Sequence, residues 1–544
     1  MASKTLRLIP LGGLGEIGKN MMIVEYGDNA VVIDTGIMFP ENDMLGIDYI
    51  IPDFRYLLNK KDRIRGIIVT HGHEDHTGAI RHVLDEIQVP IYATPLTRGL
   101  LEAKLSRNGL LRQAQIHTIR AGENARLGPF DIEFFHVCHS IPDGVGLGIN
   151  TPAGLVVHSG DFKFDHTPVD GWPTDFAKLG EFGGRGVLAL LADSTNADKR
   201  GWTPSEAVID PAFDAVFRQA KGRILIATFA SLISRMVQVA RAAERHGRVM
   251  AFVGTSMIEN AKIARNLGYL DVADELVVPL DQALNMKPSQ VVLMCTGTQG
   301  EPLSILGRLS SGNNRQFDLQ PDDTVVLSSH PIPGNEEMVH RTINRLIQRG
   351  AEVIYDAVAP VHVSGHASQE EMKLLLQLVR PRNFIPIHGE LRHLKQHAAL
   401  AREVGIPDEN IAVVENGTVV EFADNRMQVG ERVPGGYVFV DGRGVGDIGP
   451  TVMREREALA RDGFVIVHLN LNPQGSLRAQ PEIISKGFVF VRDAEELMAR
   501  AQAKVSEIVK GADGDVQERV EKELAKYFYA ETRRRPMVFV VISA

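Results

Sequence analysis

Residues 71–76 read HGHEDH, and five of these six side chains can bind a metal ion. Imidazole nitrogen and carboxylate oxygen are ligands that suit zinc or manganese. The first two histidines are two residues apart and can point the same way from an extended segment, whereas Asp75 and His76 lie around a turn and can face a second ion. Two ions ~3.5–4 Å apart clamp the attacking and leaving oxygens of a phosphoryl displacement. The stretch therefore predicts a two-metal hydrolytic site.

The metal-binding stretch follows a short apolar run at 66–70 that is typical of a strand. Similar runs recur along the chain, bounded by glycine or polar residues, with helical patterns at 78–86 and 234–246 between some of them. Alternating strands and helices predict an α/β layered architecture. Several runs end on residues that can do chemistry, and strand ends on one rim are where such folds often place their sites. These residues are Asp34, Thr70, Asp161, Asp193 and His388.

Composition narrows the class of protein. The chain has 544 residues, 44% of them hydrophobic and 23% charged, as in a globular protein with about two to four structural units. The two cysteines, Cys138 and Cys295, exclude a disulfide framework and favour a reducing, cytoplasmic setting. We find neither a signal core behind the N-terminus nor a run that could span a membrane. The net charge of −9 argues mildly against tight nonspecific nucleic-acid binding, but a local basic channel is compatible with it.

The candidate site residues are distributed unevenly, which indicates an inserted domain. Most of them occur in 1–203 and 359–449, while 204–358 has few histidines and strand-like runs of its own. We therefore expect a first domain in two parts, interrupted by an α/β domain. A linker at 450–462 and a small C-terminal α/β domain at 463–544 complete the expected organisation.

The C-terminal domain has its own pattern. Strand-like runs are expected at 464–471, 487–491 and 537–542. The helical segment between them carries apolar residues at i+4 spacing, which predicts one face packed against the strands. This stripe consists of Val516, Val520, Leu524 and Phe528.

The candidate residues follow one another in the order of a known superfamily. The H-x-H-x-D-H pattern at 71–76 resembles the signature of the metallo-β-lactamase superfamily, and Asp34, His139, Asp161 and His388 occur in the matching order. The resemblance implies two divalent ions per chain, zinc first, with manganese or magnesium as alternatives. Asp34 would not bind an ion itself but would orient one of the ligands. By resemblance, His71, His73 and His139 bind one ion, Asp75, His76 and His388 bind the other, and Asp161 bridges them.

Further motifs resemble the β-CASP group of nucleases within that superfamily. They are DSTN at 193–196, HVSGH at 362–366, and His388. The whole chain, including the glycine-rich segment 12–20 and the C-terminal domain, is similar to the bacterial ribonuclease J family. The implied fold is α/β: a metallo-β-lactamase αββα sandwich with an inserted β-CASP α/β domain and a small C-terminal α/β domain.

The β-CASP motifs imply roles in catalysis and substrate binding. A phosphodiester leaving group needs a proton, and His366, held by the Asp193 carboxylate, is the candidate general acid. The alternative is that Asp193 is a helix N-cap and His366 a structural residue. Small residues and hydroxyls in the 362–366 loop also suit an anion cradle. The expected substrate contacts are His362, Val363, Ser364, Gly365 and His366, with Ser231 added as a residue for which a plain helix N-cap is an equal alternative.

Two other patterns are weaker. The family resemblance implies a structural calcium site near Asp48 and Asp441, and oxygen ligands suit that ion, but a solvated turn is the simpler interpretation. Residues 13–18 have the G-x-G-x-x-G spacing of a dinucleotide fingerprint. The residues that follow resemble a strand instead of the required helix, so we interpret the glycines as a loop near the metal site.

These observations predict a cytoplasmic two-metal ribonuclease. Resemblance implies 5′-to-3′ exonuclease activity that prefers 5′-monophosphate ends, together with endonuclease activity. The alternatives are a DNA-directed β-CASP nuclease and a non-catalytic RNA-binding subunit of a decay complex. All seven expected ligands are present, which disfavours a dead site. The expected partners are RNA, further copies of the chain in a homodimer or homotetramer, and RNA-decay proteins, with no membrane.

Overall fold

The computed structural model describes residues 5–41, 43–332, 334–423, 426–489, 494–510 and 515–543. The chain folds into two compact units. The first comprises Met1–Phe39 and Tyr49–Val438, and the second comprises Pro40–Asp48 and Phe439–Ala544. Among the described residues, no helix combines the length and apolar character needed to cross a bilayer.

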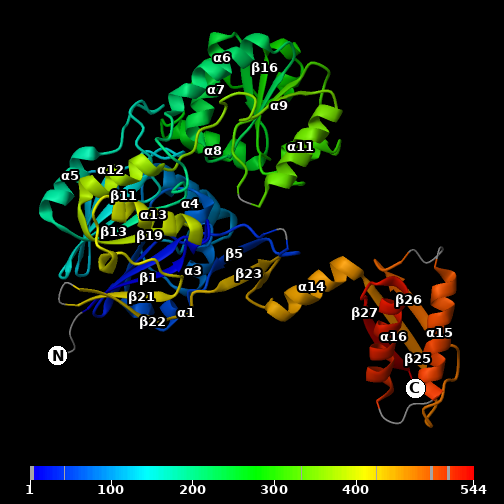
Figure 1. Ribbon diagram of the computed structural model, residues 1–544. Coiled ribbons are helices and arrows are strands. Elements are labelled where there is room, and N and C mark those ends of the chain that lie inside the picture. Colours follow the sequence, from blue (N-terminus) through cyan, green and yellow to red (C-terminus); the bar gives the residue numbers. More distant parts are fainter. Residues whose placement is uncertain are drawn as a thin grey trace. The chain divides into compact units, whose positions relative to one another are not determined.

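Two sheets stack face to face in the first unit (Figure 1). Their facing side chains form one core, to which Val24 and Ile33 contribute from one sheet and Phe134 and Leu147 from the other. The first sheet has the order β22-β21-β1-β3-β4-β6-β7-β8. Its strands are β1 (Leu6–Gly12), β3 (Met21–Tyr26), β4 (Asn29–Ile33), β6 (Ile64–Ile68), β7 (Ile91–Ala93), β8 (Ile116–Thr118), β21 (Thr418–Ala423) and β22 (Arg426–Arg432).

The second sheet has the order β19-β13-β12-β11-β10-β9. Its strands are β9 (Asn124–Leu127), β10 (Phe130–His136), β11 (Val145–Thr151), β12 (Gly154–His158), β13 (Val187–Asp193) and β19 (Pro381–Ile387). Helices cover the outer faces: α1 (Arg55–Leu58), α3 (Ile80–Glu86) and α4 (Pro95–Arg107) on the first sheet, and α5 (Phe176–Arg185), α12 (Gln369–Val379) and α13 (Leu391–Glu403) on the second. The expected αββα sandwich is confirmed.

An α/β domain is inserted between β13 and β19, as expected. These two strands are parallel neighbours, paired from Val187↔Pro381 to Asp193↔Ile387. The chain therefore leaves and re-enters the sandwich at adjacent strands, which brings Asp193 close to residue 388. The inserted sheet is parallel, with the order β15-β16-β14-β17-β18. Its strands are β14 (Ile224–Ala227), β15 (Val249–Phe252), β16 (Val291–Cys295), β17 (Thr324–Leu327) and β18 (Glu352–Ile354).

Helices flank both faces of the inserted sheet, which explains why β14, β16 and β17 are buried along their whole length. These helices are α6 (Ile209–Gln219), α7 (Ile233–Arg245), α8 (Thr255–Asn266), α9 (Leu280–Leu284), α10 (Ile305–Ser310) and α11 (Glu336–Gln348). The helical pattern read at 234–246 corresponds to α7, and the pattern at 78–86 corresponds to α3.

The second unit contains a small α/β layer. Its sheet has the order β26-β25-β27, with β25 (Phe464–Asn470), β26 (Glu482–Lys486) and β27 (Met537–Ser543). Two helices, α15 (Glu495–Lys510) and α16 (Val516–Thr532), pack on it. The segment 450–462, expected to be a linker, is helix α14 (Pro450–Asp462); all of it is described and none of its residues is buried.

One strand expected in this unit falls only partly on described residues. The strands expected at 464–471 and 537–542 are β25 and β27, and the third strand of this sheet is β26. In the run expected at 487–491, the described residues 487–489 are not in a strand. Gly487 has a φ of 70°, a left-handed conformation that ends the strand, and residues 490 and 491 lie outside the described residues. Within β26 the β-branched pair Ile483–Ile484 is the feature of the sequence that favours a strand.

Phe528→Ala should destabilise the second unit by ~3–5 kcal/mol, because truncating a buried aromatic ring leaves a cavity. Phe528 is fully buried with Val520 and Leu524 on the inner face of α16, as the stripe predicted. Tyr529→Ala is a matched control, since the neighbouring ring is 37% exposed and its loss should cost ~1 kcal/mol or less. Chemical denaturation followed by circular dichroism measures both values, and equal effects would contradict the assignment.

Candidate active site

The HGHEDH stretch turns from the end of β6 into the short helix α2 (Glu74–Thr77). Asp34, just after β4, fixes the entry to this turn, because its carboxylate accepts from the Thr70 amide at 2.8 Å and from the Thr70 hydroxyl at 2.8 Å. Gly36 allows the backbones to approach, since a Cβ there would lie 1.6 Å from the Asp75 carbonyl oxygen. The expected glycine loop lies alongside: the Asn20 amide donates to the same carbonyl at 3.0 Å, and β3 follows it as a strand.

Three histidines converge at one position. The Nδ1 atom of His73 lies 3.0 Å from Nε2 of His71 and 3.1 Å from Nε2 of His139. Burial lowers the pKa of His71 and of His139 well below the ordinary value, and burial also lowers the pKa of His73, to about 4. The three imidazoles are therefore neutral at pH 7, which is the form that binds a metal ion.

A second group of ligand atoms lies beside the first. His76 Nε2 is 3.1 Å from Asp161 Oδ2 and 3.5 Å from Asp75 Oδ2, while His388 Nε2 is 3.4 Å from that Asp75 oxygen. His388 enters from the other part of the sandwich domain, just after β19 and before β20 (Gly389–Glu390). Its backbone φ is 50°, in the left-handed region. The residues brought together here are Asp75, His76, Asp161 and His388.

Asp161 lies between the two groups. Its Oδ2 atom is 3.7 Å from His71 Nε2 and 3.8 Å from His139 Nε2, and its Oδ1 atom is 2.9 Å from His388 Nδ1. Burial alone would raise the pKa of Asp161, but the adjacent His388 and His76 hold it well below the ordinary value. The carboxylate is thus ionised and placed to bridge two cations.

The donor set fits two divalent ions. It offers imidazole nitrogens and carboxylate oxygens and no thiolate, which suits zinc or manganese. Nε2 of His388 is buried, and its 3.4 Å contact with Asp75 Oδ2 does not have hydrogen-bond geometry, so it lacks a hydrogen bond among the described residues, although a buried polar atom normally has one. An ion in the second group would satisfy it. Each of the seven residues expected as ligands therefore lies in a position to bind.

Polar contacts at the Nδ1 atom orient three of the histidines that are expected as ligands. Asp34 Oδ2 lies 2.7 Å from His76 Nδ1, and the Gly365 carbonyl accepts from His139 Nδ1 at 2.8 Å. The Thr70 hydroxyl lies 3.1 Å from His71 Nδ1. Because a carbonyl oxygen can only accept, we assign the His139 proton to Nδ1, which leaves Nε2 free to bind. Asp34 occupies the position predicted for it.

His366 and Asp193 are in contact. His366 Nδ1 lies 2.8 Å from Asp193 Oδ2, and the other Asp193 oxygen accepts from the Thr195 amide at 2.9 Å. The described residues 195–198 form a turn and no helix begins directly after Asp193, so the alternative of a helix N-cap at Asp193 is wrong. Burial alone would lower the pKa of His366, but the Asp193 carboxylate raises it above the ordinary value. The imidazole can therefore hold a proton at neutral pH.

The 362–366 loop lies against the first group of histidines. A Cβ on Gly365 would approach the His139 ring to 2.8 Å, so glycine is needed there. The Ser364 hydroxyl accepts from the Asn196 side chain at 2.8 Å and from the His366 amide at 3.2 Å. Val363 is buried, so its side chain cannot meet a substrate in solution.

His362 and Ser231 differ in how well the structure supports them. Burial, and then the positive charge of Arg235, lower the pKa of His362 well below the ordinary value. Its buried Nδ1 atom has no hydrogen-bond partner in the described part of the chain. Ser231 precedes helix α7, whose N-cap is Leu232, so the N-cap alternative for Ser231 is wrong. No hydrogen bond joins the Ser231 side chain to the loop among the described residues.

Sequence reasoning missed three residues that hold the loop. Asn196 donates to Ser364, and Thr203 Oγ1 donates to the His366 carbonyl at 2.7 Å. Glu371 is fully buried and accepts from three backbone amides, those of Phe164, Thr203 and Ser368, at 2.8, 2.6 and 2.9 Å. Ser368 and Glu371 form a capping box, and the S-x-x-E spacing was the signal that could have revealed it.

The aspartates expected at a calcium site lie in the second unit. Asp48 accepts from the Gly442 amide at 2.8 Å, and Asp441 pairs with Arg456 at 2.6 Å. The groups of three or more converging ligand side chains, as far as the structure describes the chain, do not include either aspartate. Arg456 supplies a cationic partner for Asp441 without calcium, so the calcium site stays a prediction.

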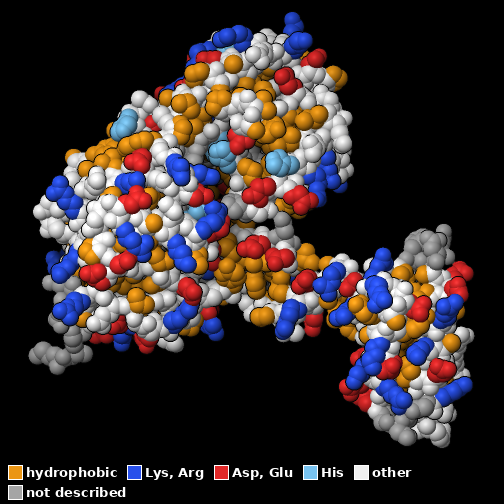
Figure 2. All heavy atoms as spheres, viewed as in Figure 1, with side chains coloured by type: hydrophobic (Ala, Val, Ile, Leu, Met, Phe, Trp, Pro, Cys, Tyr) orange, Lys and Arg blue, Asp and Glu red, His pale blue; other side chains and the backbone are white. Residues whose placement is uncertain are grey.

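The charge on the surface is mixed. Figure 2 shows lysine, arginine, aspartate and glutamate interspersed on the visible face, and histidines in the hollow between the inserted domain and the sandwich. The negative net charge is therefore not concentrated around that hollow on this face.

Comparisons with known proteins cover nearly the whole chain. Family models match at 14–203 ("Metallo-beta-lactamase superfamily"), 221–346 ("Ribonuclease J, beta-CASP domain"), 350–413 ("Zn-dependent metallo-hydrolase RNA specificity domain") and 451–544 ("Ribonuclease J C-terminal domain"). Ribonuclease J of Synechocystis is 43% identical over 99% of this chain and 87% of its own. Ribonuclease J2 of Bacillus subtilis is 40% identical over 99% of both chains.

A solved structure shares the fold. A protein of unknown function from Enterococcus faecalis V583 matches with a TM-score of 0.56 over 77% of this chain and 100% of its own. Its sequence identity of 14% limits the likeness to the fold.

Proposed function

The chain belongs to the ribonuclease J family and is a metal-dependent ribonuclease, and we propose that it degrades RNA stepwise from the 5′ end. The preferred substrate has a 5′ monophosphate, and internal cleavage accompanies the stepwise activity. The observation that supports this proposal is the position of the 362–366 loop. Its Gly365 carbonyl is bonded to His139, so a phosphate bound by the loop would lie beside the metal ligands.

Two divalent ions, with zinc the first candidate, are proposed to bind in the two groups. His71, His73 and His139 would hold one, Asp75, His76 and His388 the other, and Asp161 both. When bound, such ions stabilise charge on a phosphate and lower the pKa of an attacking water. The protein itself contributes fixed imidazoles, which Asp34, Thr70 and Gly365 hold in place.

His366 is proposed to protonate the leaving oxygen. Its Nδ1 atom is held by Asp193, so the Nε2 atom is the one that can carry a proton to a substrate. Its ring centroid lies 4.9 Å from that of His139 and 5.5 Å from that of His388, between the two groups of ligands. A leaving oxygen at the metal centre would therefore be within its reach.

The parent enzyme should degrade 5′-monophosphate RNA faster than 5′-triphosphate RNA and release mononucleotides first from the 5′ end. The reason is that a pocket sized for one phosphate disfavours a larger and more highly charged group. Ser364→Ala should weaken this preference by about 5- to 30-fold, the cost of ~1–2 kcal/mol for a lost hydrogen bond to a charged group. End-labelled RNAs of one sequence, resolved on gels over time, measure the preference.

The control for that test is Ser231→Ala, because this residue is a weaker candidate for the same pocket. Equal rates for both 5′ ends, or mononucleotides released first from the 3′ end, would refute the proposal. A DNA strand of the same sequence tests the DNA-directed alternative, since contacts to the 2′-OH decide between the two substrates.

The assembly and location are proposed by resemblance. We infer a homodimer or homotetramer, because closed symmetric assemblies are the commonest. Both cysteines lie in described segments and are free and buried, which suits a reducing cytoplasm, where RNA-decay proteins would be partners. Analytical ultracentrifugation of the purified chain tests the oligomeric state, and a monomer at micromolar concentration would exclude it.

A further inference from the structure

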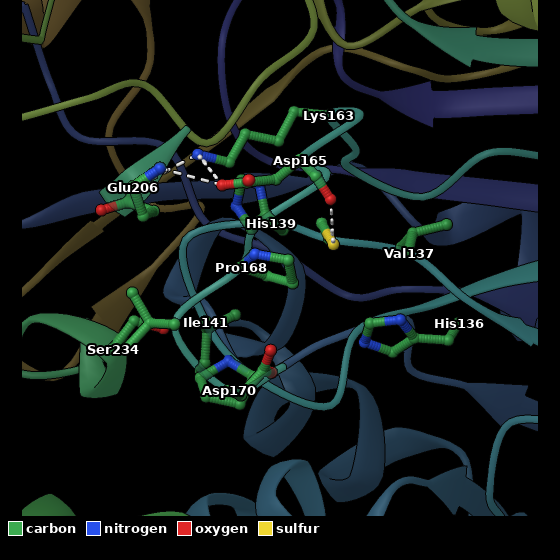
Figure 3. Close-up of a pocket in the computed structure, with 13 residues that line it drawn as sticks. His136, Val137, His139, Ile141, Lys163, Asp165, Pro168, Asp170, Glu206 and Ser234 are labelled. Carbon is green, nitrogen blue, oxygen red and sulfur yellow. Dashed lines mark hydrogen bonds and ion pairs between the residues drawn. The ribbon is translucent and has the colours of Figure 1, made fainter. Parts of the chain in front are cut away.

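Four charged side chains, which we call the charged network, are buried beside the candidate metal centre: Lys163, Asp165, Glu206 and Arg235. Figure 3 shows the first three of them. The Lys163 ammonium lies 3.5 Å from Asp165 Oδ2 and 3.3 Å from Glu206 Oε1. The other Glu206 oxygen accepts from Arg235 Nη2 at 2.8 Å. Each of the four is at most 3% exposed. None of them belongs to the two groups of ligands or to the His366–Asp193 pair, so the proposed chemistry gives them no role.

One end of the charged network is attached to the segment that carries Asp161. Lys163 follows the bridging Asp161 by two residues. The Glu206 amide donates to Asp165 Oδ2 at 2.9 Å, and the Glu206 carbonyl accepts from Gln238 at 2.9 Å. Glu206 lies where the backbone passes from the sandwich into the inserted domain. The outgoing connection is therefore fixed to the segment that carries Asp161.

The other end of the charged network is attached to the 362–366 loop. Arg235, on α7 of the inserted domain, donates to the Val361 carbonyl and to the Ser328 hydroxyl. That hydroxyl also donates to the Val361 carbonyl, at 2.6 Å. Val361 directly precedes His362, so the returning connection is held immediately before the loop. Figure 3 shows Lys163, Asp165 and Glu206 meeting above His139.

Stability alone does not explain these residues. The cost of removing two charges from water can exceed their attraction, so apolar residues of similar size would often serve as well. What the ions provide is a defined geometry: the arginine fork contacts Glu206, Gln238, Ser328 and Val361 with fixed spacing. Glu371 fixes the far end of the same loop through Ser368 and Phe164. The loop is thus anchored at both ends to the segment that follows Asp161.

We propose that Lys163, Glu206 and Arg235 are positioning residues that set the spacing between the metal centre and the 362–366 loop. A strand held by its 5′ phosphate would then present its first linkage, and not its second, to the ions. This inference rests on the proposed phosphate-binding role of the loop. It adds a structural reason why the released product is a mononucleotide.

Glu206→Gln tests the inference, because it removes the charge that joins Lys163 to Arg235 and keeps the shape. On 5′-monophosphate RNA, kcat for mononucleotide release should fall by about 10- to 100-fold, the usual effect of misplacing a substrate by ~1 Å, with KM nearly constant. The fraction of dinucleotide product should rise. Cleavage of a circular RNA, which has no 5′ end, should stay within about twofold of the parent.

Two further variants separate positioning from stability. Asp323→Asn breaks another buried ion pair of the inserted domain, in which Arg223 Nε donates to Asp323 at 3.0 Å. It should lower the free energy of unfolding without changing the ratio of mononucleotide release to circular-RNA cleavage. Ser328→Ala removes one donor to Val361 and no charge, and it should shift the ratio in the same direction as Glu206→Gln but less.

Several outcomes would overturn the inference. The charged network would have only a structural role if the ratio of mononucleotide release to circular-RNA cleavage were unchanged in Glu206→Gln. The same conclusion would follow if that ratio changed equally in Asp323→Asn. A rise in KM with kcat preserved would instead show that the charged network contributes to binding of the 5′ phosphate. The parent enzyme is the control that tests the proposed function separately. If the parent shows no preference for a 5′ monophosphate, the proposed function is wrong, and the positioning role is wrong with it. If the parent shows the preference and the variants keep their ratios, the positioning role alone fails.

Discussion

His73→Ala should abolish RNA cleavage, with a loss of at least ~10³-fold, because one ion would lose a central ligand and with it several kcal/mol of transition-state stabilisation. The Nδ1 atom of His73 lies within 3.1 Å of both other histidines of its group. The side chain is only partly buried, so its removal leaves little cavity and the free energy of unfolding should change by ~1 kcal/mol or less.

The measurement is cleavage of end-labelled RNA by purified protein, with metal content determined by mass spectrometry. His117→Ala is a suitable control, since this exposed histidine of β8 stacks on Tyr92 away from the ligands. It should keep both metals and activity. Parent-like cleavage by His73→Ala would disprove the assignment of the first group as a metal site.

His366→Ala should lower the rate of the chemical step by ~10²–10⁴, the usual contribution of a positioned acid, while metal content remains that of the parent. The contact with Asp193 at 2.8 Å and the raised pKa of the imidazole are the reasons. Single-turnover cleavage isolates the chemical step from product release.

An aryl phosphodiester gives this prediction a sharper control. A nitrophenolate departs without a proton, so a variant that lacks only the acid should cleave it at a rate close to that of the parent. An equal loss on RNA and on the aryl ester would show that His366 positions the substrate. Loss of metal from His366→Ala would make it a ligand instead.

Local patterns allowed most of the candidate metal site to be predicted. HGHEDH lies within six residues, so spacing alone indicated two groups of ligands, and the turn after β6 forms them as expected. The partners Asp161 and His388 are remote in sequence, and only their order in a known superfamily identified them. Their meeting depends on the parallel pairing of β13 with β19 across an entire inserted domain, which no local pattern encodes.

The positioning network could not be predicted, for a physical reason. Lysine, glutamate and arginine are nearly always exposed, so nothing in the sequence distinguishes Lys163, Glu206 or Arg235 from surface residues. For Glu371 the S-x-x-E spacing indicates a capping box, but not the buried contacts with Phe164 and Thr203. Burial of these groups is a property of the assembled domains, and it becomes visible only when their partners are in place.

The split sandwich has a consequence for synthesis of the protein on the ribosome. Asp161 and His388 are 227 residues apart, so at ~5–20 residues per second the second ligand group stays incomplete for ~10–45 s after Asp161 is made. The inserted domain, with its own parallel sheet, is complete in the nascent chain before β19 emerges to pair with β13. We expect stalled chains that end before His388 to resist protease in the inserted domain but not in the second sheet. If His388 is the metal ligand proposed above, the emerging chain would be unable to cut the message that encodes it until translation had passed that histidine codon.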